Sequence, residues 1–191
     1  LYTGRLHPSK GMLAVLQAFI RRPDIDAEFL ILGDGPQRET LQRLAARDAR
    51  VKLLGHVGQA DLETALRRTN IFVFPSFYEG FGLALVEAMA SGHACVCYDI
   101  PAVREVLGGT GVLVPPGDAA GLVEEVARLA KDAGWIETCS ARAYRRAGRF
   151  SWQDAREEID FIIRETAAGL GLPRASVSRL RAERSGRHRN G

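Results

Sequence analysis

Short apolar runs of strand length alternate with helix-length segments along most of the chain. Most of these runs consist only of apolar residues, so a strand formed by them would be apolar on both faces. Each run is followed directly by glycine, proline or aspartate, at which a chain turns. The expected strands are 29–32, 51–54, 71–74, 94–98 and, as a short edge strand, 112–114. Runs of this kind separated by helices are typical of a parallel sheet built from βα units. The sequence therefore predicts an α/β domain with a doubly wound parallel sheet and helices on both faces.

The segments between these runs carry apolar residues at helical spacing. The expected helices are 12–20, 37–47, 61–69, 83–91, 119–131, 135–147 and 152–168. The chain opens on Leu1-Tyr2-Thr3-Gly4 without a methionine, which is typical of the end of a strand that is already under way. We therefore expect the chain to be a piece of a longer protein.

The composition fits one such domain. With 191 residues, 46% of them hydrophobic and 26% charged, the chain can bury a core that needs no disulfide or metal. Its three cysteines are an odd number without C-x-x-C spacing, which argues against a disulfide framework and a zinc site and favours the reducing cytoplasm. The longest near-apolar run, 81–90, is about half as long as a membrane-spanning helix requires. We expect one domain over residues 1–169.

Basic residues are concentrated at the C-terminal end. The last 20 residues contain six arginines and one glutamate, whereas the whole chain has a formal net charge of only +3. A charge run of this kind is typically a solvated, disordered tail, and we assign residues 170–191 to one. Weak peripheral contact with the anionic inner face of the membrane is the second interpretation, and RNA is the third. We expect no nucleic acid partner.

In an open parallel sheet, ligands bind at the carboxyl ends of the strands, so the loops after the strands are the candidate sites. The first of these loops, 4–11, places Arg5 and Lys10 beside the start of a helix. A helix start carries unpaired N–H groups and partial positive charge, and two cations beside it suit a dianion such as a diphosphate. On this segment alone, two surface cations on a loop are an equally good interpretation.

The fourth loop, 75–82, leads into a helix that is apolar almost all round, so we expect that helix to be buried. It nevertheless contains Glu87, and a buried carboxylate is costly unless something pairs with it. A carboxylate is a usual acceptor for ribose hydroxyls, and Gly80 and Gly82 let backbone N–H groups approach an anion closely. The alternative is that Glu79 caps the helix and Glu87 lies on a solvated edge.

Three motifs in this order resemble a known family. They are GRL-x-x-x-KG from Gly4, LG-x-V from Leu54, and PS-x-x-EGFGL-x-x-x-EAMA-x-G from Pro75, with Glu79 and Glu87 in E-x7-E spacing. Together they resemble the C-terminal donor-binding domain of glycosyltransferase family 4, whose members are retaining enzymes of the GT-B fold. The resemblance extends over residues 2–168 and implies a Rossmann-like sheet in the C-terminal half of such an enzyme.

The resemblance also implies a role for individual residues. Arg5 and Lys10 would hold the donor diphosphate, and Glu87 would contact the ribose. The catalytic residues would be Arg5, Lys10 and Glu79. The other residues implied to contact the donor are His56 and Val57, at the base, and Glu79, Gly80, Phe81, Gly82 and Leu83, at the sugar and its phosphate.

The implied activity is transfer of a sugar from a nucleotide-diphospho-sugar to an acceptor with retention of anomeric configuration. This chain would be the donor-binding half and inactive by itself, with helix 152–168 docked on a missing N-terminal domain. No metal and no cofactor are expected, because Arg5 and Lys10 supply positive charge. Two alternatives stay open: a non-catalytic sugar-nucleotide-binding module and a sugar-nucleotide epimerase of similar fold. The residues specify neither the base, the sugar nor the acceptor.

Two further patterns do not support other chemistry. Asp24-Ile25-Asp26 matches the D-x-D pattern of metal-dependent glycosyltransferases, but it precedes a strand and so belongs at the sheet end away from the binding loops. Gly33-Asp34-Gly35-Pro36 lacks the third glycine of a dinucleotide fingerprint, which argues against a nicotinamide enzyme.

We expect the cysteines and histidines to have structural roles and not to bind a metal. Cys95 and Cys97 alternate on one strand and are expected to be small buried thiols. The three histidines near strand ends, His7, His56 and His93, lack partners at metal-ligand spacing. Many family members have proline in place of His93, and a Gly-Gly pair in place of Pro101-Ala102. The second departure leaves the donor contacts of loop 99–104 open.

Overall fold

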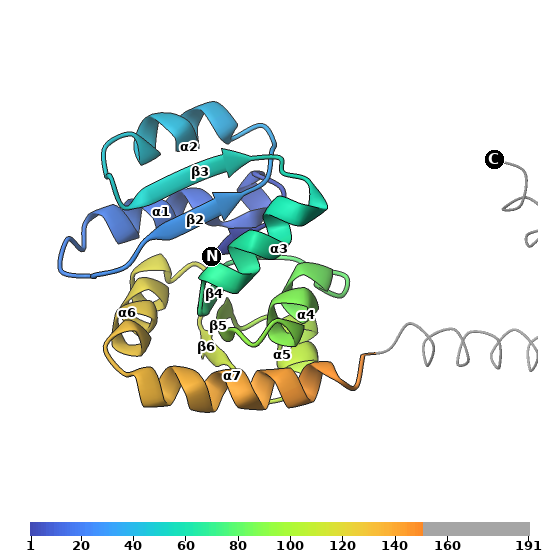
Figure 1. Ribbon diagram of the computed structural model, residues 1–191. Coiled ribbons are helices and arrows are strands. Elements are labelled where there is room, and N and C mark those ends of the chain that lie inside the picture. The colour runs from blue at the N-terminus through green and yellow to red at the C-terminus, as the bar shows by residue number, and fades with distance from the viewer. Residues whose placement is uncertain (151–191) are drawn as a thin grey trace, which may run out of the picture. The chain divides into compact units, whose positions relative to one another are not determined.

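Six parallel strands form the centre of the computed structural model, which describes residues 1–150 (Figure 1). They are β1 (Tyr2–Thr3), β2 (Phe29–Leu32), β3 (Val51–Gly55), β4 (Ile71–Phe74), β5 (Ala94–Tyr98) and β6 (Val112–Val114). Strands β2, β4, β5 and β6 have the predicted bounds, and β3 is one residue longer than predicted. The helix expected at 152–168 and the tail at 170–191 lie outside the described residues.

The strands pair in parallel as two groups of three, β1-β2-β3 and β4-β5-β6. Leu1 joins the two groups, because its amino group donates to Ile71 O over 2.8 Å and its carbonyl accepts from Val73 N–H over 2.9 Å. The strands therefore follow the order β3-β2-β1-β4-β5-β6. This is the doubly wound Rossmann order. Strands β2 and β3 are added on one side of β1 and strands β4 to β6 on the other, so the strand order reverses between β1 and β4.

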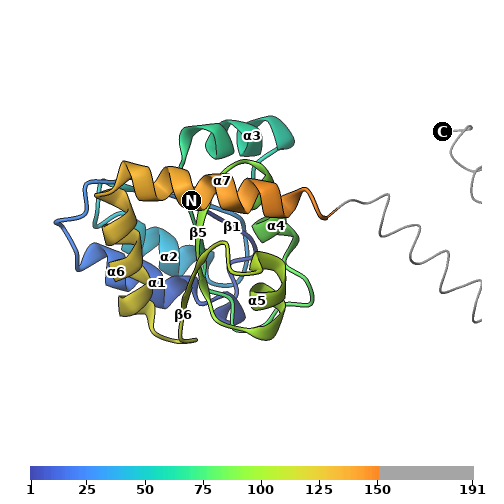
Figure 2. The same ribbon diagram turned by 90° about the horizontal axis from the view of Figure 1, so that it is seen from below.

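Seven α-helices within residues 1–150 connect and cover the strands. They are α1 (Met12–Ile20), α2 (Arg38–Ala45), α3 (Gln59–Arg68), α4 (Leu83–Ala90), α5 (Pro101–Leu107), α6 (Ala119–Ala130) and α7 (Ala133–Ala147). Figure 2 shows α1, α2 and α6 on one side of the strands and α3, α4 and α5 on the other. The prediction of a parallel sheet covered on both faces is confirmed, and the helices predicted within residues 1–150 differ from the observed ones by at most two residues at either end. No helix in this part of the chain is long and apolar enough to cross a membrane.

Helix α5 corrects the expectation that residues 99–104 form a loop after β5. The helix begins at Pro101, and its N-cap Ile100 is extended. Proline suits the first helical position, because its ring fixes a helical φ and the N–H that it lacks would have had no partner there. The helix ends at Gly108, which is left-handed with φ of +54°. Pro101 therefore starts a helix rather than extending a loop.

The polar and sulfur-containing side chains near β5 are buried. Cys95, Cys97 and Cys139 are free and buried, as predicted for Cys95 and Cys97, and burial raises the pKa of Cys95. His93 lies before β5, where its Nδ1 donates to Ala88 O over 3.0 Å and its Nε2 lies 2.9 Å from Thr69 Oγ1. Burial lowers the pKa of His93 to about 4, so the ring is neutral at pH 7 and connects the end of α3 to the end of α4.

Candidate functional site

A cavity of about 520 Å³ lies at the carboxyl ends of β1 and β4, where the strand order reverses. Its walls come from the ends of both strands, the loops that follow them and the first turn of α4. Crevices at this position in open α/β sheets are the usual ligand sites. The residues predicted from the sequence that line it are Arg5, Lys10, Glu79, Phe81, Gly82 and Leu83. The lining residues that the sequence interpretation missed are Tyr2, Thr3, Gly4, Phe74 and Ala84.

The loops after β1 and β4 are joined by backbone contacts. Phe77 N–H donates to Ser9 O over 2.9 Å, and a Cβ built on Gly11 would lie 2.3 Å from Pro75 O. Gly11 is also left-handed, with φ of +68°, so only glycine fits this position without strain. A single 3-10 turn, Pro8–Lys10, precedes Gly11, and Lys10 at its end pairs with Glu79 of the loop after β4. The close approach at Gly11 therefore places the charged residues of both loops in one cavity.

Two cations and one carboxylate face this cavity. Lys10 Nζ forms an ion pair with Glu79 Oε1, and their side chains are only 16% and 14% exposed. Arg5 is exposed, and no side-chain acceptor contacts its guanidinium among residues 1–150. Tyr2 lies beneath them and donates from its hydroxyl to Arg5 O over 2.9 Å; burial raises the pKa of Tyr2, and the nearby Glu79 carboxylate adds to the rise. The cavity therefore carries an excess positive charge that suits an anion.

The first turn of α4 adds backbone donors to the same cavity. Its N-cap, Gly82, is left-handed with φ of +91°, and the first hydrogen bond within the helix runs from Leu85 N–H to Gly82 O over 2.9 Å. The N–H groups of Leu83 and Ala84 precede this bond and have no acceptor within the helix. Both residues line the cavity. The helix start therefore presents partial positive charge on the side where Arg5 and Lys10 lie.

Glu87 lies on a solvated edge of its helix, as the alternative interpretation expected, and not in a buried environment. The prediction that its helix is buried all round is wrong, because α4 exposes Leu83, Glu87 and Ala90 and buries Leu85 and Met89. These exposed positions share one face of the helix, since residues three and four apart are neighbours. Glu87 is thus a solvent-exposed carboxylate one turn beyond Leu83, outside the cavity lining.

His56, Val57 and Gly80 also lie outside the cavity lining. His56 and Val57 follow β3, two strands away from β1, which is a separation of about 10 Å at the usual strand spacing. His56 is exposed near Asp34, whose pKa is held below its usual value by the Gly35 N–H and by the Arg38 guanidinium. Gly80 is exposed in the loop before α4. The structure therefore brings together the residues expected at the phosphates and sugar, apart from Gly80, and places those expected at the base farther along the same sheet edge.

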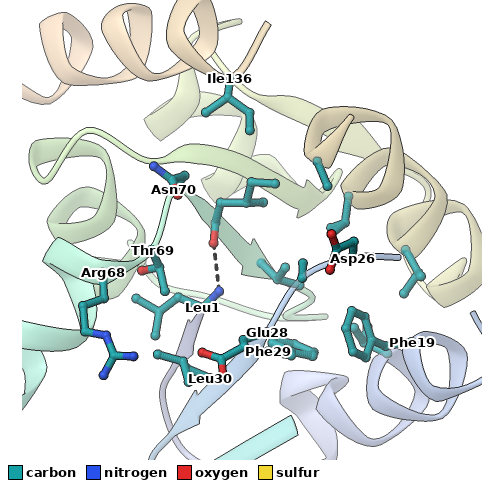
Figure 3. A pocket seen from close by; sticks show the side chains of 17 residues that line it. Leu1, Phe19, Asp26, Glu28, Phe29, Leu30, Arg68, Thr69, Asn70 and Ile136 are labelled. Atoms are coloured by element: carbon teal, nitrogen blue, oxygen red, sulfur yellow. Dashed lines mark hydrogen bonds between the residues drawn. The ribbon is translucent and has the colours of Figure 1, made fainter. Parts of the chain in front are cut away.

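A second cavity, of about 360 Å³, lies at the opposite edge of the sheet and was not predicted (Figure 3). It opens at the amino ends of β2 and β4, and its lining combines apolar side chains such as Phe19 and Ile136 with polar ones such as Arg68. The hydrogen bond from the Leu1 amino group to Ile71 O crosses it. Its position depends on which strands become neighbours, and a local sequence pattern does not report that.

The D-x-D residues lie at this amino edge, as predicted from their place before β2. Asp26 lines the second cavity, whereas Asp24 pairs with Arg22 at 2.8 Å. Among residues 1–150, no three His, Cys, Asp or Glu side chains are grouped so that they could hold a metal ion.

Comparisons with known proteins agree with this architecture. Residues 1–132 match the family model described as "Glycosyl transferases group 1". The chain is 35% identical over 184 residues to phosphatidyl-myo-inositol mannosyltransferase of Mycolicibacterium smegmatis, covering 90% of this chain and 46% of that protein. It is 34% identical over 161 residues to O-antigen chain mannosyltransferase B of Escherichia coli, covering 81% and 42%. The chain thus spans about half the length of the curated relatives that it matches.

Solved structures share the same fold. Sucrose-phosphate synthase from Thermosynechococcus elongatus superposes with a TM-score of 0.77 and 26% identity, over 88% of this chain and 45% of that one. Anabaena HepE in complex with UDP-glucose gives a TM-score of 0.76 and 24% identity, over 86% and 48%. These neighbours establish the Rossmann-like fold of GT-B glycosyltransferases. With a family model that matches more than half of its residues and relatives above 30% identity along most of its length, the chain belongs to the glycosyl transferases group 1.

Proposed function

We propose that this chain is the C-terminal, donor-binding half of a retaining glycosyltransferase of family 4 and that it binds a nucleotide-diphospho-sugar. One observation carries the proposal: Arg5, Lys10, Glu79 and the free N–H groups at the start of α4 meet in one cavity where the strand order reverses. Some structural neighbours hold UDP or UDP-glucose, which supports a ligand of this class. The other half of the enzyme would bind the acceptor, since the chain spans about half of its relatives.

The diphosphate would lie between the two cations and the start of α4. Arg5 and Lys10 supply full charges, and the N–H groups of Leu83 and Ala84 supply hydrogen bonds to phosphate oxygens. Glu79, Gly80 and Phe81 belong to the loop at the cavity rim and would face the sugar. In the proposed arrangement the scissile bond would lie next to these donors.

The nucleoside would extend along the exposed face of α4 and the sheet edge. Glu87 follows Leu83 on that face at a rise of about 6 Å, so a ribose attached to a phosphate at the helix start lies within its reach. Glu87 would accept hydrogen bonds from the ribose hydroxyls. The base would then approach His56 and Val57 at the end of β3.

In the proposed reaction, the bond between the anomeric carbon and the phosphate oxygen breaks and a bond to the acceptor oxygen forms on the same face. Negative charge grows on the leaving phosphate, and Arg5, Lys10 and the α4 start stabilise it where they already lie. The acceptor proton passes to the leaving phosphate. Because cations of the chain meet this charge, the proposed mechanism requires no metal ion.

Two experiments test the proposal. A thermal-shift panel of UDP, GDP and ADP with their sugar conjugates identifies the donor, since a ligand at 100 times its dissociation constant adds about 2.7 kcal/mol of stability. Incubation of the 191-residue chain with that donor and a panel of acceptors should give no transfer. Sugar transfer by this chain alone would contradict the assignment to a donor-binding half. No shift with any of these ligands would contradict donor binding, and epimerised donor as the product would favour the epimerase alternative.

A further inference from the structure

One of the two cations expected to hold the diphosphate already has a partner. Lys10 Nζ pairs with Glu79, which comes from a different loop, and both side chains are largely shielded from water. Arg5, by contrast, is exposed and contacts no side-chain acceptor among the described residues. The two cations of the cavity are therefore not equivalent, because one is neutralised and the other is not.

An entering diphosphate meets Glu79 in two unfavourable ways. The carboxylate occupies one direction of approach to the Lys10 ammonium, and its negative charge repels phosphate oxygens at short range. Because the pair is shielded from solvent, this repulsion is stronger than it would be at an exposed pair. The Glu79 charge also acts on the neighbouring Tyr2: burial raises the pKa of the Tyr2 hydroxyl, and the negative charge of Glu79 raises it further. Glu79 thus lowers the positive potential of the cavity that would bind phosphate.

A donor sugar can compensate for this effect. Sugar hydroxyl groups donate hydrogen bonds, and Glu79 lines the cavity in which the proposed function puts the sugar. A carboxylate that moves from Lys10 to sugar hydroxyls exchanges one set of hydrogen bonds for another. A free nucleoside diphosphate offers no such hydroxyls at this position.

We propose that Glu79 competes with the diphosphate for Lys10, so that the site holds the sugar nucleotide but releases the free nucleoside diphosphate. The proposal rests on the proposed function and adds a means of product release to it. While the donor is bound, Glu79 accepts hydrogen bonds from the sugar and Lys10 contacts phosphate. After transfer the sugar has left, Glu79 returns to Lys10, and the nucleoside diphosphate dissociates.

The test is the affinity of Glu79→Gln for the nucleoside diphosphate, measured by titration calorimetry on the 191-residue chain. Glutamine keeps the shape of the side chain but removes its charge, so Lys10 keeps at most a neutral hydrogen-bond acceptor, which a diphosphate displaces more easily than a carboxylate. We expect this variant to bind the nucleoside diphosphate and inorganic pyrophosphate about fivefold more tightly, the equivalent of about 1 kcal/mol. Its affinity for the sugar nucleotide should stay equal or fall.

Three control variants make the result specific. Asp48→Asn removes an equally shielded carboxylate, which pairs with Arg50 just before β3, and should leave nucleoside diphosphate affinity unchanged. Lys10→Met should weaken binding, and combining it with Glu79→Gln should abolish the gain. Glu79→Ala provides a second neutral variant in case Glu79→Gln does not fold, and unfolding temperatures without ligand verify each variant.

The outcomes separate the two proposals. If Lys10→Met leaves nucleoside diphosphate affinity unchanged, the diphosphate does not contact Lys10 and the proposed function is wrong. If Lys10→Met weakens binding while Glu79→Gln fails to tighten it, the competition proposal alone is wrong. A gain that persists in the Lys10→Met background would also overturn it, because general repulsion rather than competition for Lys10 would then explain the gain.

Discussion

The two edges of the sheet both carry a cavity and charged side chains, but they use the charges differently. At the amino edge, the Arg50 guanidinium donates to Arg22 O over 2.9 Å and to Ile25 O over 2.7 Å and pairs with Asp48. At the carboxyl edge, Arg5 contacts no side-chain acceptor in the described part of the chain, and Lys10 has one carboxylate partner. The Arg50 guanidinium therefore holds the segments before β2 and β3 together, whereas Arg5 and Lys10 face the cavity at the carboxyl ends of β1 and β4.

The edges also differ in how closely their backbones approach. At the carboxyl edge, a Cβ on Gly33 would lie 1.8 Å from Gly4 O, so the loops after β1 and β2 touch through glycine. At the amino edge, Gly92 before β5 is left-handed but has no atom within 4 Å of such a Cβ. A side chain at Gly33 would therefore collide with the backbone, whereas one at Gly92 would meet open space.

The largest predicted effect is on stability. Gly33→Ala forces a methyl group into the Gly4 carbonyl and should cost about 4 kcal/mol of unfolding free energy or prevent folding. The matched change Gly92→Ala meets only the left-handed backbone penalty and should cost about 1 kcal/mol. Urea denaturation of both variants measures the difference. Equal losses would remove the contrast between the edges.

The next effect is the pH dependence of stability through His93 at the amino edge. Its pKa falls from 6.5 in the unfolded chain to about 4 in the fold, so the unfolded state binds more protons between these pH values. The stabilisation is complete above pH 6.5 and is lost as pH falls toward 4, by up to about 3 kcal/mol. Denaturation of the wild type and His93→Gln from pH 7 to 4 should give a flatter profile for the variant. Parallel profiles would show that His93 is not responsible.

The third prediction concerns catalysis at the carboxyl edge. In the complete enzyme, Lys10→Ala should reduce the transfer rate about 100-fold, the usual effect of removing one preorganised group that stabilises charge. Arg68→Ala, which changes a cation at the amino-edge cavity, should leave the rate unchanged. Activity should persist in EDTA. Full loss in EDTA with recovery on adding magnesium would instead assign the charge stabilisation to a metal.

The smallest effect is expected at Glu87. Glu87→Gln should weaken nucleoside diphosphate binding about fivefold, because a hydrogen bond to a charged acceptor is lost. The loss should shrink when the ligand is a 2′,3′-dideoxynucleotide, which lacks the hydroxyl partners. Glu28→Gln, an equally exposed carboxylate at the amino-edge cavity, is the control. Equal losses for ribose and dideoxyribose ligands would rule out the ribose contact.

The sequence predicted the sheet well because a buried parallel strand is an uninterrupted apolar run, as in Phe29–Leu32 and Ala94–Tyr98. Helix α5 was missed because Pro101 is compatible with both a turn and a first helical position. The family resemblance implied that Arg5, Lys10 and Glu79 share one site, and they line one cavity because β1 and β4 are neighbours in the fold. Their pairing could not be predicted, because it depends on the close approach of Gly11 to Pro75.

Two errors have one physical cause. Because α4 has apolar residues almost all round, it was expected to be buried. Its outer face is instead exposed, as are Phe81 and Tyr78 in the preceding loop. A local pattern reports the polarity of a segment and cannot report whether another element covers it. The amino-edge cavity was missed for the same reason, because its walls come from segments far apart in the sequence.

The three buried thiols make this chain convenient for site-specific labelling. Cys95, Cys97 and Cys139 account for every cysteine in the sequence, and burial raises the pKa of each, which keeps them protonated and slow to react with maleimides at neutral pH. Tyr78, at 78% exposure in the loop that carries Glu79, offers an accessible attachment point. A fluorophore on Tyr78→Cys would therefore report on donor arrival and product departure in real time without removal of any native cysteine.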